Sequence, residues 1–311
     1  MRHLEPLELE HRSLVMDWLR RYPPAVSDLT FTNLFVWRRS HPIRLLATDA
    51  ALLVLAGTVE EGRLCVGGPL GEMAASDVIT LMQDVAPAAP FLGFERVPEG
   101  ALPQLRAAGL EPAADRENCD YVYRRQDLAT LKGRRLHSKR NLVKRCLSRH
   151  QCSIEPMTPE NMGEVVEMQD RWCLAHDWGA DPGLCHECAA IRELLGHYEE
   201  LGVTGAAVRV DGRVEAFTVG EQLAPGTAVI HFEKAMPAIE GLYQVVNQWF
   251  CRDYLADFEF VNREQDLGIS GLRKAKQSYQ PHHMVRKYKA LLAEPLEQAA
   301  AGEGVMRCGR P

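Results

Sequence analysis

The order of helix and strand patterns in the second half of the chain constrains its fold most strongly. Residues 152–292 predict a strand, two helices, three strands, a helix, a strand, a helix and a final strand. Asp211-Gly212 joins the first two central strands and is a strong two-residue hairpin signal. The three central strands are predicted at 204–210, 213–221 and 227–234. Such an order predicts an α/β (α+β) domain, with a mixed central sheet flanked by helices.

The first half of the chain predicts a second domain of the same class. A helix over 7–21 stops at Pro23-Pro24, and Ser27-Asp28 precedes an aromatic-rich helix over 29–37. Further elements are strands at 43–47, 51–57, 63–67, 91–97 and 120–124, and helices at 76–85 and 102–108. We therefore expect an N-terminal domain (1–128), a basic linker helix (129–151), a C-terminal domain (152–292) and a flexible tail (293–311).

Charge is unevenly distributed along the chain. The 311 residues contain 36 Lys and Arg against 42 Asp and Glu, a net charge of −6. Residues 128–154 carry eight basic side chains and no acid, and residues 267–293 carry six and no acid. The rest of the chain therefore carries −20, which argues against indiscriminate binding to nucleic acid or membranes. We expect the two basic segments to converge on one focused anion site.

Other classes of protein are disfavoured by what the sequence contains. The longest apolar run is far shorter than the roughly 18 residues of a membrane helix, and the N-terminal residues do not resemble a secretory leader. We interpret the nine cysteines as reduced thiols of a cytoplasmic protein. Cys185 and Cys188 form a C-x-x-C motif without a second ligand pair, so we expect small helix-core residues and no metal.

Polar residues cluster where two predicted strands end. The strand 227–234 turns polar at His231 and Glu233, and residues 262–268 follow directly from an apolar strand. A polar strand end in an α/β sheet favours a cleft, although an edge strand with one wet face would look alike. The helix predicted over 270–279 begins with free N–H groups and is rich in Lys and Arg, which favours a phosphate or carboxylate site over a merely solvated helix.

Several long motifs resemble one known family. They are "SDLTFTNLFVW" at 27–37, "LHSKRNLVKR" at 136–145, "HFEKA" at 231–235, "GLYQVVNQWF" at 241–250 and "NREQDLGISGLRKAKQSYQP" at 262–281. Over residues 5–292 the chain resembles the DUF2156 family, which includes the soluble C-terminal part of bacterial phosphatidylglycerol lysyltransferases. The resemblance implies two tandem GNAT-like acyltransferase domains, joined by the helix that carries Lys139-Arg140-Asn141. The element order of 152–292 is also that of a GNAT fold.

The resemblance implies transfer of an aminoacyl group from aminoacyl-tRNA to a lipid headgroup or another small acceptor. Asn262 or a backbone N–H would stabilise the oxyanion, and Glu233 or Asp266 would act as base or hold the α-amino group. The candidate catalytic residues are Glu233, Asn262, Asp266 and His231. The candidate substrate-binding residues are Lys139, Arg140, Lys144, Lys234, Arg263, Arg273, Lys274, Lys276, Tyr279 and Lys287. No cofactor is required, because tRNA or acyl-CoA serves as the donor substrate.

Two alternatives remain open from the sequence. An acyl-CoA-dependent N-acetyltransferase would use the same fold, but residues 236–241 stand where its pyrophosphate loop would be expected. A non-catalytic binder of RNA or anionic lipid would need the basic segments and not the acids. The first domain is expected to support the second, with Asp28 and Asn33 near the junction.

Overall fold

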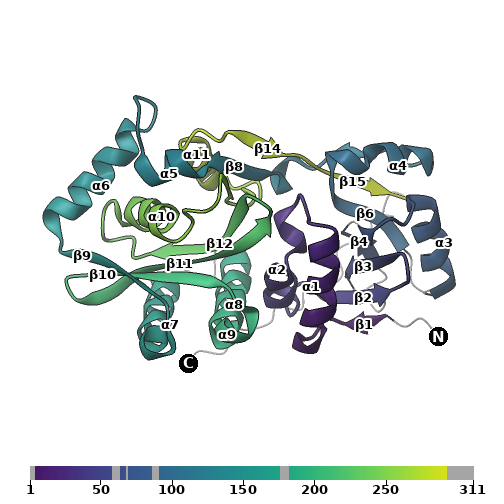
Figure 1. The fold of residues 1–311 in the computed structure, drawn as a ribbon, viewed down its shortest axis with the longest axis horizontal. Helices are drawn as coiled ribbons and strands as arrows, with labels where there is room; N and C mark the ends of the chain where they lie inside the picture. The colour runs from purple at the N-terminus through teal and green to yellow at the C-terminus, as the bar shows by residue number, and fades with distance from the viewer. Residues whose placement is uncertain (1–3, 58–63, 68, 86–90, 176–181, 293–311) are drawn as a thin grey trace.

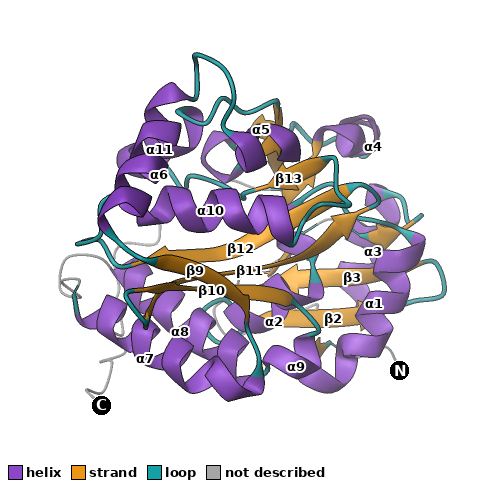
Figure 2. Ribbon diagram, turned by 60° about the vertical axis from the view of Figure 1, so that its left-hand side comes forward, coloured by secondary structure: helices purple, strands orange, loops and turns teal. Residues whose placement is uncertain are grey.

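The strands of the protein form two sheets that lie side by side along its longest axis (Figure 1). The computed structural model describes residues 4–57, 64–67, 69–85, 91–175 and 182–292. The predicted tail, 293–311, lies outside the described residues. Helices cover both faces of the second sheet, and the predicted α/β class is confirmed (Figure 2).

The first sheet has the order β1-β2-β3-β4-β6-β15-β7, with β5 paired to β3. Its strands are β1 (Glu5–Pro6), β2 (Ile43–Ala47), β3 (Ala51–Ala56), β4 (Leu64–Val66), β5 (Leu70–Gly71), β6 (Phe91–Pro98), β7 (Ala113–Ala114) and β15 (Lys287–Leu291). The second sheet has the order β14-β8-β13-β12-β11-β10-β9. Its strands are β8 (Asp120–Arg124), β9 (Cys152–Pro156), β10 (Thr204–Val210), β11 (Arg213–Ala224), β12 (Thr227–Ala235), β13 (Phe260–Asn262) and β14 (His283–Val285).

The two sheets exchange one strand each. β8 precedes the predicted linker, yet it pairs with β13 and β14 in the second sheet. β15 lies near the C-terminal end of the described chain, yet it pairs with β6 and β7 in the first sheet (Figure 1). Neither sheet is therefore built from the residues of one predicted domain alone, and the division at 128 and 152 stays a prediction.

The helices enclose three apolar cores. The α-helices are α1 (Arg12–Arg21), α2 (Phe31–Trp37), α3 (Ala75–Val85), α4 (Leu102–Ala107), α5 (Arg125–Thr130), α6 (His137–Arg149), α7 (Pro159–Leu174), α8 (Pro182–Gly196), α9 (Tyr198–Leu201), α10 (Leu242–Asp253) and α11 (Ser270–Gln277). Short 3₁₀ turns are η1 (Leu9–His11), η2 (Ser27–Leu29), η3 (Glu99–Ala101) and η4 (Arg116–Asn118). One core joins α1 and α2 to α7 and α8, a second lies under α5, α6 and α10, and a third lies between the first sheet, α3 and α4.

The segment predicted as a linker helix, 129–151, contains the last two residues of α5, a turn and the helix α6. α5 ends at Thr130, where Leu131 adopts a left-handed backbone conformation and Gly133 has a positive φ. α6 begins at His137 and buries Val143 and Cys146. These two side chains join the core beneath α10, while Lys144, Arg145 and Arg149 of α6 are exposed.

Close contact between α6 and the start of α10 depends on Gly241. This residue has a φ of +89°, and a Cβ added there would overlap the carbonyl oxygen of Leu142 in α6. We expect Gly241→Ala to lower the free energy of unfolding by at least about 2 kcal/mol, since it adds a clash to a left-handed backbone. Urea unfolding tests this, with Gly226→Ala as control: Gly226 has a φ of +75° and open space around it. Equal losses in both variants would contradict the proposed contact.

A β-bulge in β12 changes which side chains face α10. The sequence predicts Ala228, Ile230 and Phe232 on one face of this strand and His231 and Glu233 on the other. The register with β11 shifts between Ile230 and Phe232, so Ile230 joins the core beneath α10 and Phe232 joins the core with α7 and α8. The predicted alternation is therefore wrong beyond Ile230, and the bulge turns Glu233 toward α10.

The prediction that all cysteines are reduced thiols is wrong for two of them. Cys173 in α7 and Cys188 in α8 are joined by a disulfide. Among the described residues, no group of three or more His, Cys, Asp or Glu is arranged to hold a metal ion. Nor does any helix in the described ranges have the length and apolar character needed to cross a membrane.

Candidate active site between strands β12 and β13

The parallel strands β12 and β13 pair at only three positions, and the chain segments that follow them separate. They pair only where Thr227–Val229 of β12 meets Phe260–Asn262 of β13. Beyond this point β12 continues to Ala235, while the chain after β13 runs into residues 263–268. Ligands in open α/β sheets favour the carboxyl ends of such strands. We call the two segments 230–235 and 263–268, with the side chains that lie between them, the wedge.

Glu233 and Arg263 form the outer ion pair of the wedge. Arg263 Nη2 donates to Glu233 Oε1 over 2.9 Å, and Asn247 Nδ2 of α10 donates to Glu233 Oε2 over 2.8 Å. The side chains of Glu233 and Arg263 are 11% and 14% exposed. Burial alone would lower the pKa of Arg263, but the Glu233 carboxylate outweighs it and raises that pKa.

The side chains that hold Glu233 keep unused hydrogen-bonding atoms. Arg263 Nη1 and Asn247 Oδ1 are buried, and neither has a hydrogen-bond partner within the described part of the chain. Buried polar atoms are almost always paired in folded proteins, so a donor and an acceptor left open beside one carboxylate call for an explanation. Both atoms are therefore available to hydrogen-bond partners that the described residues do not supply.

Lys139 brings the first basic segment to the wedge. Its Nζ lies 4.8 Å from the centre of the Tyr279 ring, and the Arg263 guanidinium lies at 4.8 Å from the same ring. Burial, and then the charge of Arg263, lower the pKa of Lys139. The two acid-free segments therefore meet at Tyr279, which follows α11, and they concentrate positive charge beside Glu233.

His231 lies deeper and is held between two carboxylates. Its Nδ1 lies 2.9 Å from Glu264 Oε1, and its Nε2 lies 2.9 Å from Glu221 Oε1. Although burial opposes it, hydrogen bonds that the ring donates to these two carboxylates raise the pKa of His231 to about 9. At neutral pH the ring is therefore charged and both N–H groups are engaged, which makes His231 a poor proton acceptor.

The charge on His231 predicts a loss of stability at alkaline pH. Because the pKa of about 9 in the folded protein exceeds the usual histidine value of 6.5, the stability contributed by His231 is complete below about pH 6.5 and is lost as the pH rises through 9. We expect about 3 kcal/mol of unfolding free energy to disappear. Urea unfolding from pH 6 to 9.5 measures this, with His231→Gln as the reference. A variant as pH-sensitive as the wild type would contradict the assignment.

Asn262 and Lys287 are tied into the junction between the sheets rather than into the wedge. Lys287 Nζ contacts Asp28 and lies 2.6 Å from Asp120 Oδ1, and Asn262 Nδ2 donates to Asp120 Oδ2 over 3.0 Å. Both side chains are fully buried. Asn33 donates to Glu264 over 2.8 Å, so Asp28 and Asn33 do lie at the junction, as expected.

Asp266 anchors α11 to β8. It accepts hydrogen bonds from Tyr121 Oη at 2.6 Å, Arg273 at 2.9 Å and Arg116 at 3.1 Å, and its own side chain is fully buried. Burial raises its pKa, but the hydrogen bonds from Arg273 and Tyr121 prevail and the pKa of Asp266 is lowered. The geometry supports an anchoring role for Asp266 and Arg273.

The other predicted binding residues are dispersed. Lys276 donates to the carbonyl oxygens of Arg263 and Gln265, and burial lowers its pKa to about 8. Lys234 faces α7 and α8, where it pairs with Glu187 at 2.7 Å. Arg140 donates to the Leu131 carbonyl over 2.8 Å. Lys144 and Lys274 are exposed on α6 and α11.

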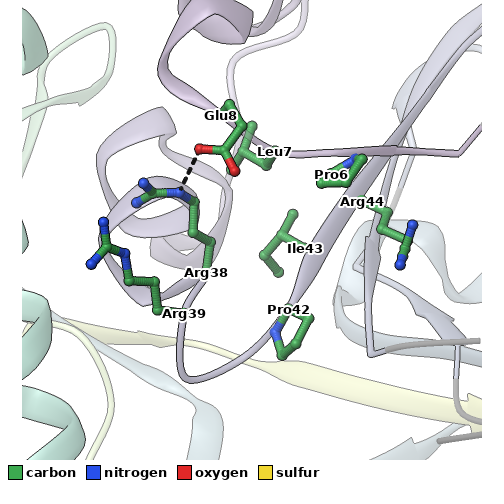
Figure 3. Close-up of a pocket in the computed structure, with 8 residues that line it drawn as sticks. All are labelled: Pro6, Leu7, Glu8, Arg38, Arg39, Pro42, Ile43 and Arg44. Carbon is green, nitrogen blue, oxygen red and sulfur yellow. Dashed lines mark hydrogen bonds and ion pairs between the residues drawn. The ribbon is translucent and has the colours of Figure 1, made fainter. Parts of the chain in front are cut away.

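Sequence reasoning missed the partners that give the wedge its geometry. Asn247 is a buried amide inside an apolar helix, a signal that was present in "GLYQVVNQWF". Asp120 carried no such signal, because it acts through Asn262, 142 residues away in the chain. Glu221 contacts His231 across the pairing of β11 with β12. A cavity of about 220 Å³ lies elsewhere, at the edge of the first sheet, where Arg38 pairs with Glu8 on one side and Arg44 lines the other (Figure 3).

The fold and sequence are similar to those of known proteins. A conserved protein of unknown function from Bacteroides thetaiotaomicron is 30% identical, with a TM-score of 0.87 over 94% of this chain and 100% of its own. L-PGS from Bacillus licheniformis is 16% identical, with a TM-score of 0.62 over 92% of each chain. A tandem GNAT protein from the clavulanic acid pathway is 11% identical, with a TM-score of 0.50 over 95% of this chain and 100% of its own, which shows a GNAT-like fold. No curated protein matches.

The family itself follows from a match along most of the chain. The model described as "Phosphatidylglycerol lysyltransferase, C-terminal" matches residues 19–291, which include both sheets' central strands and the whole wedge. The resemblance seen in the motifs is thus confirmed, and the chain belongs to the family of phosphatidylglycerol lysyltransferase C-terminal domains.

Proposed function

We propose that the protein is an aminoacyltransferase whose reaction takes place in the wedge. The observation that carries the proposal is the pair of unused buried atoms, Arg263 Nη1 and Asn247 Oδ1, on the two side chains that hold Glu233. A site with one carboxylate, one open donor and one open acceptor suits a polar acyl group. The family to which the chain belongs supports aminoacyl transfer as the reaction class.

The chemistry assigned to the wedge is attack on an activated ester. The hydroxyl of an acceptor, a lipid headgroup or another small molecule, loses its proton to Glu233 as its oxygen bonds to the ester carbon. The bond from that carbon to the tRNA ribose oxygen then breaks, and the ribose hydroxyl leaves with the proton. Arg263 and Lys139 stabilise the oxyanion and the nearby phosphates. The ester supplies the driving force, so the proposed reaction uses no further cofactor.

The burial and bonding of the other predicted residues decide which of them we assign to substrate binding. Asn262, Asp266 and His231 are fully buried at the side chain and bonded to neighbours, so they position the wedge rather than touch substrate. Lys139, Arg263 and Tyr279 remain as the substrate-binding group, with Lys144 and Lys274 available for more distant phosphates. We place the reaction in the cytoplasm, where aminoacyl-tRNA is made.

The start of α10 favours aminoacyl-tRNA over acyl-CoA as the donor. A helix N-terminus is a natural phosphate site. Here it is covered by α6 through Gly241, and Glu240 beside it is bonded to Arg145 and Arg149. The Glu240 carboxylate would repel a pyrophosphate at this position, and the packed helix α6 would block it sterically. We expect acetyl-CoA to leave the melting temperature unchanged, and clear stabilisation would favour the acyl-CoA reading.

A transfer assay tests the proposal. The protein is incubated with radiolabelled aminoacyl-tRNAs and, in separate reactions, with extracted lipids or with peptides. We expect label to leave the tRNA and enter the lipid fraction. Label in the peptide reaction would assign a different acceptor to the same chemistry, and no transfer from any aminoacyl-tRNA would reject the proposal.

A further inference from the structure

Three cysteines lie together where α7 ends and α8 begins, on two helices that run side by side (Figures 1 and 2). Cys173, in the last turn of α7, is joined to Cys188 of α8, and their Cα atoms are 6.7 Å apart. Cys185 stands three residues before Cys188, and residues three apart on a helix have Cβ atoms about 5–6 Å apart. All three are disulfide-bonded. We call them the cysteine cluster.

The sequence around the cysteine cluster has the spacing of metal ligands. Cys185-x-x-Cys188 is preceded by Cys173-x-x-His176, so the C-x-x-C motif does have a second pair of donor residues. Two such pairs of Cys and His, separated by a short stretch of chain, are typical of structural zinc sites. His176 lies outside the described residues, so the cysteines alone define the cluster in the structure.

Gln169 contacts two of the sulfurs from one turn earlier in α7. It is fully buried, and its Nε2 donates to Cys173 Sγ over 3.1 Å and lies 3.5 Å from Cys188 Sγ. Its Oε1 is buried without a hydrogen-bond partner in the described part of the chain. Neutral sulfur is a weak acceptor, whereas a thiolate accepts a charge-assisted hydrogen bond. The amide therefore suits metal-bound thiolates, whose sulfurs are regularly held by such hydrogen bonds, better than a disulfide.

We propose that the cysteine cluster, once reduced, binds a zinc ion that clamps α7 to α8. While the sulfurs are oxidised, the described residues offer no group of ligands for a metal. A dithiol reductant breaks each S–S bond by giving two electrons and two protons to its sulfurs, and is itself oxidised to a disulfide. Each thiol then passes its proton to solvent as its sulfur bonds to the metal. Soft thiolate ligands select zinc over magnesium or calcium.

The clamp supports β12 next to the wedge. Lys234, the neighbour of Glu233, is buried, and its Nζ pairs with Glu187 of α8 over 2.7 Å. The same Nζ lies 3.9 Å from the centre of the Trp172 ring in α7. Glu187 and Trp172 each precede a cysteine of the cluster, so the metal fixes both partners of Lys234. The inference goes beyond the proposed function, because metal binding requires no transfer and either can fail alone.

Metal titration of the full chain tests the inference without tRNA or lipid. The protein is reduced with a phosphine, and Co²⁺ is added as a spectroscopic probe before zinc displaces it. We expect about one Co²⁺ per reduced chain, with the charge-transfer absorption that marks cobalt–thiolate bonds, and no such absorption in the oxidised protein. Zinc should raise the melting temperature of the reduced protein.

Two variants and a control locate the site. Gln169→Leu should weaken zinc binding by about 10–100-fold, and loss of a ligand in Cys185→Ser should weaken it further. Cys152→Ser is the control, because Cys152 is a partly buried thiol of β9 outside the cluster, and it should bind zinc as the wild type does. Undiminished zinc binding by Cys185→Ser would overturn the inference. So would a reduced wild type that shows no thiolate absorption with Co²⁺, a result that does not depend on how any variant folds.

Discussion

Replacing Lys287 by Met is expected to lower the free energy of unfolding by about 3–5 kcal/mol. Lys287 is fully buried and joins Asp28, from the first half of the chain, to Asp120 in β8 of the second sheet. Asp120 is itself fully buried, and Arg96 gives Asp28 a second partner at 2.7 Å. Removing the cation leaves Asp120 with Asn262 and Ser27 but without a counter-charge, which is the costly way to break a buried pair.

Urea unfolding of Lys287→Met measures this loss. Lys289→Met is the control, because Lys289 is an exposed residue of the same strand, β15, and its replacement should change stability by less than about 0.5 kcal/mol. Adding Asp120→Asn to Lys287→Met should recover part of the loss, since it removes the stranded charge. A Lys287→Met protein as stable as the control would show that the junction is not held by this ion pair.

Glu233→Gln is expected to slow aminoacyl transfer by a factor of about 10²–10⁴. Gln keeps the size of the side chain and can still accept from Arg263 or Asn247, but it cannot take the acceptor proton. Binding of tRNA should change little, because phosphate contacts come from the basic residues. The single-turnover rate of transfer measures the effect, and the melting temperature checks the fold.

Glu215→Gln is a closely matched control for this experiment. Glu215 lies on the neighbouring strand β11, is 13% exposed against 11% for Glu233, and pairs with Arg171 at 2.9 Å. It differs from Glu233 in lying outside the wedge. Its replacement should leave the transfer rate within about twofold of the wild type, which corresponds to a surface-type effect of a few tenths of a kcal/mol.

Local signals explain which elements of the fold were predictable. The strand β10 begins and ends at the predicted residues, because Asp211-Gly212 and the apolar residues of the strand act within a few positions. The exchange of β8 and β15 between sheets has no local signal, since Lys287 pairs with Pro98 and Val261 with Tyr123 far along the chain. The bulge before Phe232 likewise depends on its pairing with β11.

The same reasoning explains the candidate site. Polar residues at the ends of β12 and β13 were visible in the sequence, and the structure does gather Glu233, Arg263, Lys139 and Tyr279 at one place. Which of these polar side chains keep free hydrogen-bonding atoms depends on partners that are distant in the chain. Asn262 bonds to Asp120 across a separation of 142 residues, and Asp266 bonds to Tyr121 across 145. These partners turn two predicted catalytic residues into anchors.

The central claim is that the wedge transfers an aminoacyl group, and single-turnover transfer tests it most directly. Wild type, Glu233→Gln and Glu215→Gln are each mixed in excess with radiolabelled aminoacyl-tRNA and extracted lipid. The account predicts rapid labelling of lipid by the wild type and by Glu215→Gln, and labelling at least about a hundredfold slower by Glu233→Gln. Equal rates for Glu233→Gln and the wild type would contradict it, as would a folded wild type that transfers label from no aminoacyl-tRNA to either lipid or peptide.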